Sequence, residues 1–344
     1  MKNKIAVLVS VPLVFFGISF EIISRPVLSV KPENIEIDQA APKWPETGKN
    51  TFFLRQNYVL PFEKILVPVR KEGKNDILIN AKSVLAVDDF SGQTLYEKDA
   101  EQKVKIASLT KLATASAMLD FIKTENSNLI IKAGNYNFSE IVEISKTALG
   151  AEGDSGYLLI GEKIKVGDLL KIMLIASSNG AARAIAEDIT KKNNSKEQGI
   201  RYFVGLMNNF AEKEGLTGTH FTNPDGVDER DNYSTAKDVV TLSRGLLNDY
   251  PEIFSITIID KINIRSADGK NDHFIKNTNK LLGNLPGIIG GKTGYTDEAG
   301  ESLLLVVEDS TRQHRIVAVV IGANGRFSEM EKLVKWIWDS YEWK

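Results

Sequence analysis

A serine and a lysine, Ser108 and Lys111, stand three residues apart in this chain. In a helix the two side chains lie on one face, one turn apart, so the amine can take the serine's proton. This chemistry is that of a nucleophile with its general base. A structural interpretation is equally open: Ser108 caps the helix and Lys111 runs its stem along the surface. The spacing does not decide, because it recurs at Ser234 and Lys237.

The residues after Ser108 predict a buried helix. Apolar side chains continue nearly all the way round the segment as far as Ile122, which is typical of a helix enclosed by the protein. Unpaired polar groups are costly in such a setting, so a serine and a lysine at its start need a reason. Nucleophilic catalysis is one such reason.

Two further triplets carry groups that can act on a bound substrate. Ser177-Ser178-Asn179 supplies hydroxyl and amide groups between two predicted helices, 166–176 and 181–189. Lys292-Thr293-Gly294 supplies an amine and a hydroxyl between a glycine-rich stretch and a strand that starts near Gly300. Each triplet alone is a weak signal, but the three together, in this order, are a strong one.

The elements that must position these residues change in kind along the chain. Alternating or continuous apolar runs predict strands over 83–88, 93–97, 256–262, 300–307 and 315–321. Helical spacing predicts helices over 200–214, 235–247 and 328–341, in addition to those around the triplets. We therefore expect an α+β fold. An antiparallel sheet would be built from both ends of the chain and flanked by helices, with a mainly helical lobe of about residues 115–250 inserted.

Composition narrows the chemistry. The 344 residues include no cysteine, which excludes thiol nucleophiles and cysteine metal sites. The net charge of −2 shows no basic excess, so nucleic acid is not an expected partner. His220, His273 and His314 are scattered without metal-ligand spacing, which argues against a zinc hydrolase. A Ser-His-Asp triad stays open, because its members need not be close in sequence.

The first 80 residues differ from the rest. Lys2 and Lys4 precede an apolar run to Phe20, so residues 1–24 are expected to form a signal peptide or a signal anchor. The absence of a convincing cleavage site favours the anchor. Six prolines fall within 25–80, which predicts an extended tether or an arm along the domain. A domain of residues 81–344 would then work outside the cytoplasm, secreted or held at a membrane.

The motif set resembles that of serine β-lactamases and penicillin-binding proteins. From about residue 80 onward the chain is similar to the D-alanyl-D-alanine carboxypeptidases, the low-molecular-mass penicillin-binding proteins. Besides the three motifs, the similar segments are the opening hairpin of 81–98 and the stretches 221–226, 233–238 and 291–300. The resemblance implies a β-lactamase/DD-peptidase-like fold. It also implies that Ser234 is a structural position, so Lys237 is not the base.

The resemblance implies a catalytic role for four of these residues. Ser108 is the acylated nucleophile and Lys111, held neutral, is its general base. Ser177 relays a proton towards the leaving D-alanine, and Asn179 orients Lys111 and the substrate amide. A second lysine nearby and a dry cleft favour the neutral form of Lys111.

The resemblance implies substrate contacts for the remaining candidates. Lys292 supplies positive potential and Thr293 contacts the substrate carboxylate, with Gly294 completing the motif. Backbone N–H groups of Ser108 and Tyr295 form the oxyanion hole. Arg326 matches the arginine that binds the carboxylate in the family.

The function so implied is removal of the terminal D-alanine from peptidoglycan pentapeptides that end in D-Ala-D-Ala. β-Lactam antibiotics are the expected inhibitors, the amino-terminal segment is the expected membrane contact, and no cofactor or metal is implied. A D,D-endopeptidase that cuts cross-links with the same residues is an open alternative. A β-lactamase is a weaker one, because no Glu-x-x-Leu-Asn segment follows the second motif. A non-catalytic wall-binding module is disfavoured by the intact motifs.

Overall fold

The computed structural model describes residues 66–127, 136–150, 157–193 and 199–344. The expected export segment 1–24 and most of the expected arm lie outside these residues. Within them, no helix combines the length and the apolar character needed to cross a membrane.

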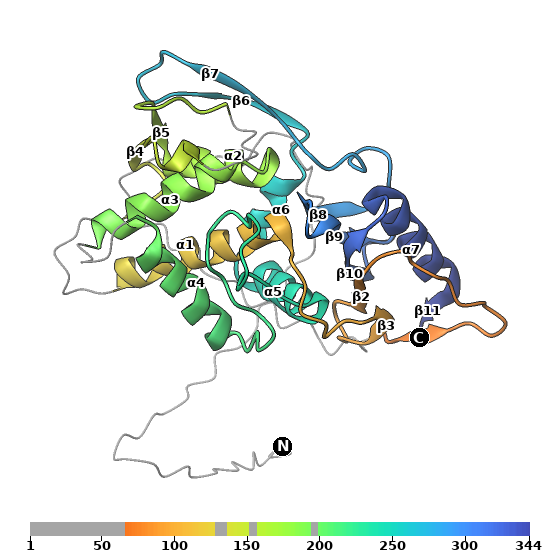
Figure 1. Ribbon diagram of the computed structural model, residues 1–344. Helices are drawn as coiled ribbons and strands as arrows, with labels where there is room; N and C mark the ends of the chain where they lie inside the picture. The colour runs from red at the N-terminus through yellow and green to blue at the C-terminus, as the bar shows by residue number, and fades with distance from the viewer. Residues whose placement is uncertain (1–65, 128–135, 151–156, 194–198) are drawn as a thin grey trace, which may run out of the picture. The chain divides into compact units, whose positions relative to one another are not determined.

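A five-stranded antiparallel sheet joins the two ends of the described chain, as the strand pattern predicted (Figure 1). Its order is β3-β2-β10-β9-β8, so that β8 is an edge strand. The strands are β2 (Ser83–Asp88), β3 (Thr94–Lys98), β8 (Ile288–Thr296), β9 (Gly300–Glu308) and β10 (Arg315–Ala323). The expected α+β architecture is confirmed.

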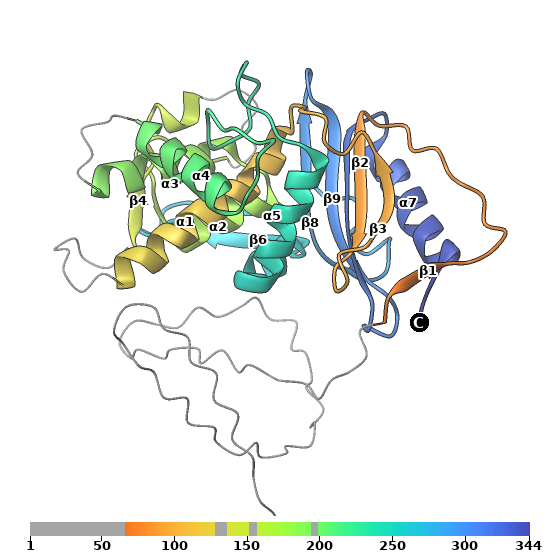
Figure 2. The same ribbon diagram turned by 90° about the horizontal axis from the view of Figure 1, so that it is seen from below.

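The sheet is buried on both faces, because successive side chains of a strand point to opposite sides. Leu303 and Leu305 belong to one apolar cluster, formed with α7 (Arg326–Ser340). Leu304 and Val306 belong to another, formed with the other helices. In Figure 2, α7 lies on one side of the sheet, and α5 (Ala236–Asp249) lies on the other.

Six helices come from the described part of the chain between β3 and β8, and they lie beside the sheet in Figure 1. They are α1 (Thr110–Ser127), α2 (Val166–Ile175), α3 (Asn179–Lys192), α4 (Arg201–Lys213), α5 and α6 (Pro251–Thr257). Short hairpins accompany them: β4 (Ile141–Glu143) with β5 (Lys163–Lys165), and β6 (Lys261–Arg265) with β7 (Asp272–Lys276). Single 3-10 turns are η1 (Ala107–Leu109) and η2 (Ala148–Gly150).

One predicted strand, 256–262, is wrong over its first part. Pro251 stands at the first position of α6, where its fixed φ suits a helix, and the helix continues to Thr257. Ile253, Phe254 and Ile256 are buried there. The strand β6 begins only at Lys261. A short apolar run fits a strand and a buried helix equally well, and here its first part is helical.

The lysine triplet lies inside the strand β8 and not in a loop before a strand. The glycines before it allow a close approach of neighbouring atoms. A Cβ at Gly290 would lie 2.3 Å from Cδ1 of Phe254, and one at Gly291 would lie 2.7 Å from the carbonyl oxygen of Leu304.

The two ends of the described chain also pair with each other. Strand β1 (Pro68–Arg70) runs antiparallel to β11 (Tyr341–Trp343), which directly follows α7. Ile79 is fully buried in the cluster under α7. Residues 66–80, the last part of the expected arm, therefore pack along the domain.

Candidate active site

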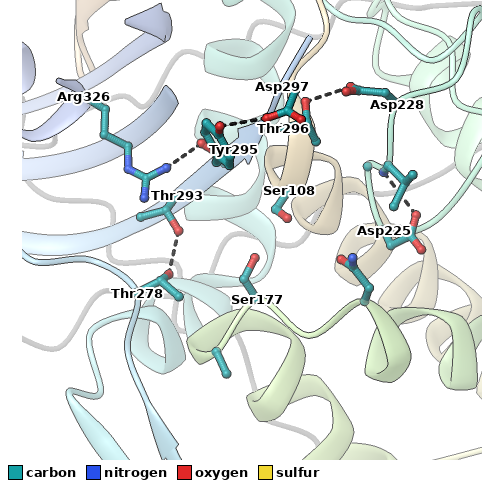
Figure 3. Close-up of a pocket in the computed structure, with 15 residues that line it drawn as sticks. Ser108, Ser177, Asp225, Asp228, Thr278, Thr293, Tyr295, Thr296, Asp297 and Arg326 are labelled. Carbon is teal, nitrogen blue, oxygen red and sulfur yellow. Dashed lines mark hydrogen bonds between the residues drawn. The ribbon is translucent and has the colours of Figure 1, made fainter. Parts of the chain in front are cut away.

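The three motifs meet in one cleft of about 510 Å³ beside the edge strand β8 (Figure 3). Ser108 comes from η1, Ser177 and Asn179 from the link between α2 and α3, and Thr293 from β8. Arg326, the first residue of α7, lines the cleft as well. Ser108 lies between the other labelled groups in Figure 3, with Arg326 and Asp225 to either side.

Lys111 is the centre of a hydrogen-bonded group at the bottom of this cleft. The side chain is fully buried, and its Nζ lies 2.8 Å from Oγ of Ser108. The same nitrogen lies 2.7 Å from Oδ1 of Asn179 and 2.6 Å from the carbonyl oxygen of Asp225. Two N–H bonds of a neutral amine can serve these two oxygens, while its lone pair accepts the Ser108 hydroxyl. An ammonium can use the same contacts, so a proton can pass from Ser108 without rearrangement.

Two residues of the site have a left-handed backbone conformation. Ala107 has φ +48° and Ser177 has φ +64°, values that side-chain-bearing residues seldom adopt and that cost about 1–3 kcal/mol each. The packing of the surrounding residues holds the backbone in this conformation despite the cost. Ser177 turns the chain between two helices, and Ser178 caps α3 by accepting a bond from the N–H of Ala181. The predicted link between two helices is confirmed.

Lys292 is the second buried lysine of the site. Its Nζ donates to Oγ of Ser177 at 2.7 Å and to the carbonyl oxygen of Thr293 at 3.1 Å. Burial lowers the pKa of Lys292 well below its ordinary value, and the neighbouring charges of Lys111 and Arg326 lower it further. Two cations so close together in a dry site repel each other, which favours a neutral amine on one of them.

The remaining motif residues shape the wall formed by β8. Gly294 brings the strand against η1, since a Cβ there would lie 2.9 Å from the carbonyl oxygen of Ile106. Arg326 Nη1 donates to the carbonyl oxygen of Gly294 at 2.7 Å. Tyr295 is exposed, and its hydroxyl donates to Asp297 at 2.9 Å.

Two groups at the site were not singled out from the sequence. One is Thr278, whose Oγ1 lies 2.6 Å from Oγ1 of Thr293 (Figure 3). The other is the loop 223–228, which supplies the Asp225 carbonyl to Lys111. This loop was noted as part of a similar segment but given no role, and its Asn-Pro-Asp-Gly turn residues were the available signal.

The rival serine and lysine do not line the cleft. Oγ of Ser234 lies 2.7 Å from Oγ1 of Thr219, and the residue is buried. Lys237 is exposed and pairs with Glu101 at 2.5 Å. The spacing at this second copy therefore comes from a strand-like bridge followed by a helix start, with the two side chains in separate contacts.

The three histidines also lie elsewhere. His273 is buried and contacts Glu162 at 2.7 Å, between β7 and the start of β5. His220 contacts the carbonyl oxygen of Asp231, and His314 stacks on Trp343. A triad through one of these histidines and Ser108 is therefore absent from the described residues.

Comparisons with known proteins agree with this geometry. D-alanyl-D-alanine carboxypeptidase DacF of Bacillus subtilis is 31% identical over 278 residues, which are 79% of this chain and 66% of that protein. The carboxypeptidase DacC of Escherichia coli is 32% identical over 269 residues, which are 75% of this chain and 61% of that protein. The chain thus spans just under two thirds of the length of these relatives.

Solved structures have the same fold. A D-alanyl-D-alanine carboxypeptidase from Mycobacterium tuberculosis superposes with a TM-score of 0.66 at 26% identity, covering 79% of this chain and 96% of that one. A variant of a Streptomyces DD-transpeptidase superposes with a TM-score of 0.66 at 25% identity, covering 77% of this chain and all of that one. Residues 70–325 match the peptidase family described as D-alanyl-D-alanine carboxypeptidase, and the chain belongs to that family.

Proposed function

We propose that this chain is a serine D-alanyl-D-alanine carboxypeptidase that removes the terminal D-alanine from peptidoglycan stem peptides. The observation that carries the proposal is the 2.8 Å contact between the buried Lys111 amine and the Ser108 hydroxyl, inside a cleft that also holds the other two motifs. Family membership and the names of the relatives support the same activity.

In the acylation step, Ser108 Oγ attacks the carbonyl carbon of the penultimate D-alanine and Lys111 takes the hydroxyl proton. Asn179 and the Asp225 carbonyl hold the amine in place through the step. The peptide C–N bond then breaks, the D-alanine amine takes a proton, and an ester remains on Ser108. Water hydrolyses this ester in a second step.

The leaving D-alanine carries a carboxylate, and the positive side of the cleft suits it. Arg326 and Thr293 are the proposed contacts of this carboxylate, and Lys292 lies behind them. A bound carboxylate favours the charged form of Lys292, which burial disfavours in the free protein. Ser177, 2.7 Å from Lys292 Nζ, is the proposed route for the proton to the leaving amine.

Backbone N–H groups of Ser108 and Tyr295 are the proposed donors to the oxyanion of the tetrahedral intermediate. The close approach of Gly294 to Ser108 supports this, because it brings the two backbones to one side of the cleft. Such a donor typically contributes about 3–4 kcal/mol to the transition state.

The test uses the purified protein with diacetyl-Lys-D-Ala-D-Ala and a fluorescent penicillin. We expect release of D-alanine and one covalent penicillin adduct on Ser108, identified by mass spectrometry of peptide fragments. Both are lost in Ser108→Ala. An adduct on another residue, or no D-alanine release by a folded sample, contradicts the proposal.

Adding cross-linked muropeptides, an amine acceptor and a penicillin chase to this experiment separates the rival activities. A D,D-endopeptidase releases monomers from cross-linked muropeptides and spares the linear pentapeptide. A DD-transpeptidase, the activity that names the Streptomyces neighbour, joins the acyl group to an added amine acceptor. A β-lactamase turns penicillin over rapidly, so the adduct disappears within a short chase.

We also propose that the enzyme works outside the cytoplasm and contacts a membrane through residues 1–24. The support is the sequence of that segment, with its two lysines followed by an apolar run. Fractionation of cells that express the full chain tests this: we expect it in the membrane fraction, with residues 1–24 retained.

A further inference from the structure

A partly buried ion pair lies next to the proposed general base. Arg183 of α3 donates from Nε to Oδ2 of Asp225, whose side chain is fully buried. The carbonyl oxygen of the same Asp225 is the one that contacts Lys111 Nζ at 2.6 Å. One residue therefore joins the base to an arginine on the helix of the second motif.

The sequence positions explain how α3 reaches both groups. Asn179 and Arg183 are four residues apart in α3, so they lie on the same face of the helix. Asn179 contacts Lys111 itself, and Arg183 contacts the residue that supplies the third partner of Lys111. One face of α3 therefore contacts the Lys111 amine directly, through Asn179, and indirectly, through Arg183 and Asp225.

The charges around Lys111 give the ion pair a second consequence. Lys292 of β8 is close enough for the charge of Lys111 to lower its pKa, and this mutual repulsion favours a neutral amine on one of the two lysines. Asp225, whose backbone carbonyl contacts Lys111, carries the opposite charge on its side chain, and a carboxylate near an amine favours the ammonium form. The positive charge of Arg183 offsets the negative charge of Asp225. Lys111 therefore keeps its hydrogen bond to the Asp225 carbonyl, while the carboxylate stabilises the ammonium form less.

We propose that Arg183 and Asp225 are positioning residues for Lys111: the pair holds the Asp225 carbonyl against the amine and cancels the carboxylate charge, so that Lys111 rests neutral. This inference rests on the proposed function for its importance in catalysis. The protonation of Lys111, however, can be measured without any activity.

The test compares single and double variants at the two positions. Arg183→Gln leaves the carboxylate unopposed, so the titration midpoint of Lys111 moves up by about one pH unit or more. Asp225→Asn keeps the carbonyl and leaves Arg183 unopposed, so the midpoint moves down by a comparable amount. In the double variant the two changes offset each other, and Arg183→Lys stays near the native value.

The midpoint is read by NMR from isotope-labelled lysine Cε, with the Lys111 signal identified by its loss in Lys111→Arg. Acylation by penicillin gives an independent readout, because the acid limb of its pH profile follows the same order. On that acid limb, where the amine is mostly protonated, a rise of one unit slows acylation about tenfold. Arg244→Gln is the matched control, since Arg244 likewise joins a helix to a loop through Asp89 but lies outside the cleft.

Opposite shifts in the two single variants support the inference. Shifts in one direction, or none beyond that of Arg244→Gln, overturn it, since loss of packing alone gives no opposite signs. Arg183→Gln leaves a buried carboxylate unpaired, which is strongly destabilising. If that variant does not fold, Asp225→Asn and the double variant decide, because adding Arg183→Gln must raise the midpoint. Failure of the native chain to form a penicillin adduct refutes the proposed function and leaves the NMR comparison standing.

Discussion

Gly226 is the residue whose replacement tests most directly how the loop 223–228 supports the nucleophile. Its φ is +84°, in the left-handed region. A Cβ at this position would lie 2.0 Å from the carbonyl oxygen of Ala107 and 2.9 Å from Oγ1 of Thr110. The neighbouring atom is backbone, so no side-chain rotation can relieve the overlap. Gly226→Ala therefore forces the loop and η1 apart.

The size of the effect follows from these distances. A relaxed contact needs about 3.5 Å, so the two backbones must separate by roughly 1.5 Å. The Lys111–Asp225 hydrogen bond, 2.6 Å long in the native protein, is then broken. The left-handed backbone adds about 1–2 kcal/mol and the lost buried bond about 1–3 kcal/mol, so we expect a loss of about 2–5 kcal/mol in the free energy of unfolding. A displacement of this size at the base slows acylation about a hundredfold.

Gly283→Ala is the matched control for this prediction. Gly283 has φ +78°, and a Cβ there would meet nothing within 4 Å. It therefore has the same backbone penalty without the overlap, about 1–2 kcal/mol and no change in the acylation rate. The assays are urea unfolding and the rate of covalent labelling by a fluorescent penicillin.

Equal behaviour of the two variants refutes the reasoning. If Gly226→Ala acylates at the native rate, the loop does not hold the base in the way proposed. If both variants lose the same stability, the backbone conformation alone accounts for the effect.

Two further predictions concern the lysines. Lys292→Met loses substrate processing but stabilises the fold at neutral pH by about 1–2 kcal/mol, because folding must either bury the charge of Lys292 or remove its proton, and methionine has neither cost. The pKa of Lys292 is lowered on folding, so below the ordinary lysine pKa the unfolded chain binds more protons. The advantage of the variant in urea unfolding must therefore shrink as the pH rises towards that value, and an advantage that grows with pH contradicts this. Lys237→Gln breaks an exposed pair with Glu101 and leaves acylation unchanged; a large loss of rate in this variant revives the second serine–lysine copy as a candidate site.

Much of the fold could be predicted because its signals are local. The hairpin of β2 and β3 and the helices α2 to α5 follow from apolar periodicity and turn residues within about 15 positions. The errors lie where long-range packing decides. The strand predicted over 256–262 begins inside the helix α6, and β8 was not predicted as a strand. The glycines of β8 allow the close approach of Phe254 and Leu304 from other elements.

The motif residues could be named from the sequence because their side chains are chemically distinctive and their order is rare by chance. Which serine and lysine act together was not decided by their spacing, since two copies share it. The tertiary structure separates them: in one pair Ser108 lines the cleft and contacts Lys111 at 2.8 Å, while the other pair has its two side chains in separate contacts.

By itself, then, the sequence determined most of the strands and helices and the identities of the reactive side chains. Only the tertiary structure decided what holds them. The third partner of Lys111 is a backbone carbonyl, 114 positions away in the chain, and Arg183 from yet another element pairs with the side chain of the same residue. Every residue has a carbonyl, so such a contact leaves no mark on residue type. It exists only once the loop 223–228, α1 and α3 are packed together.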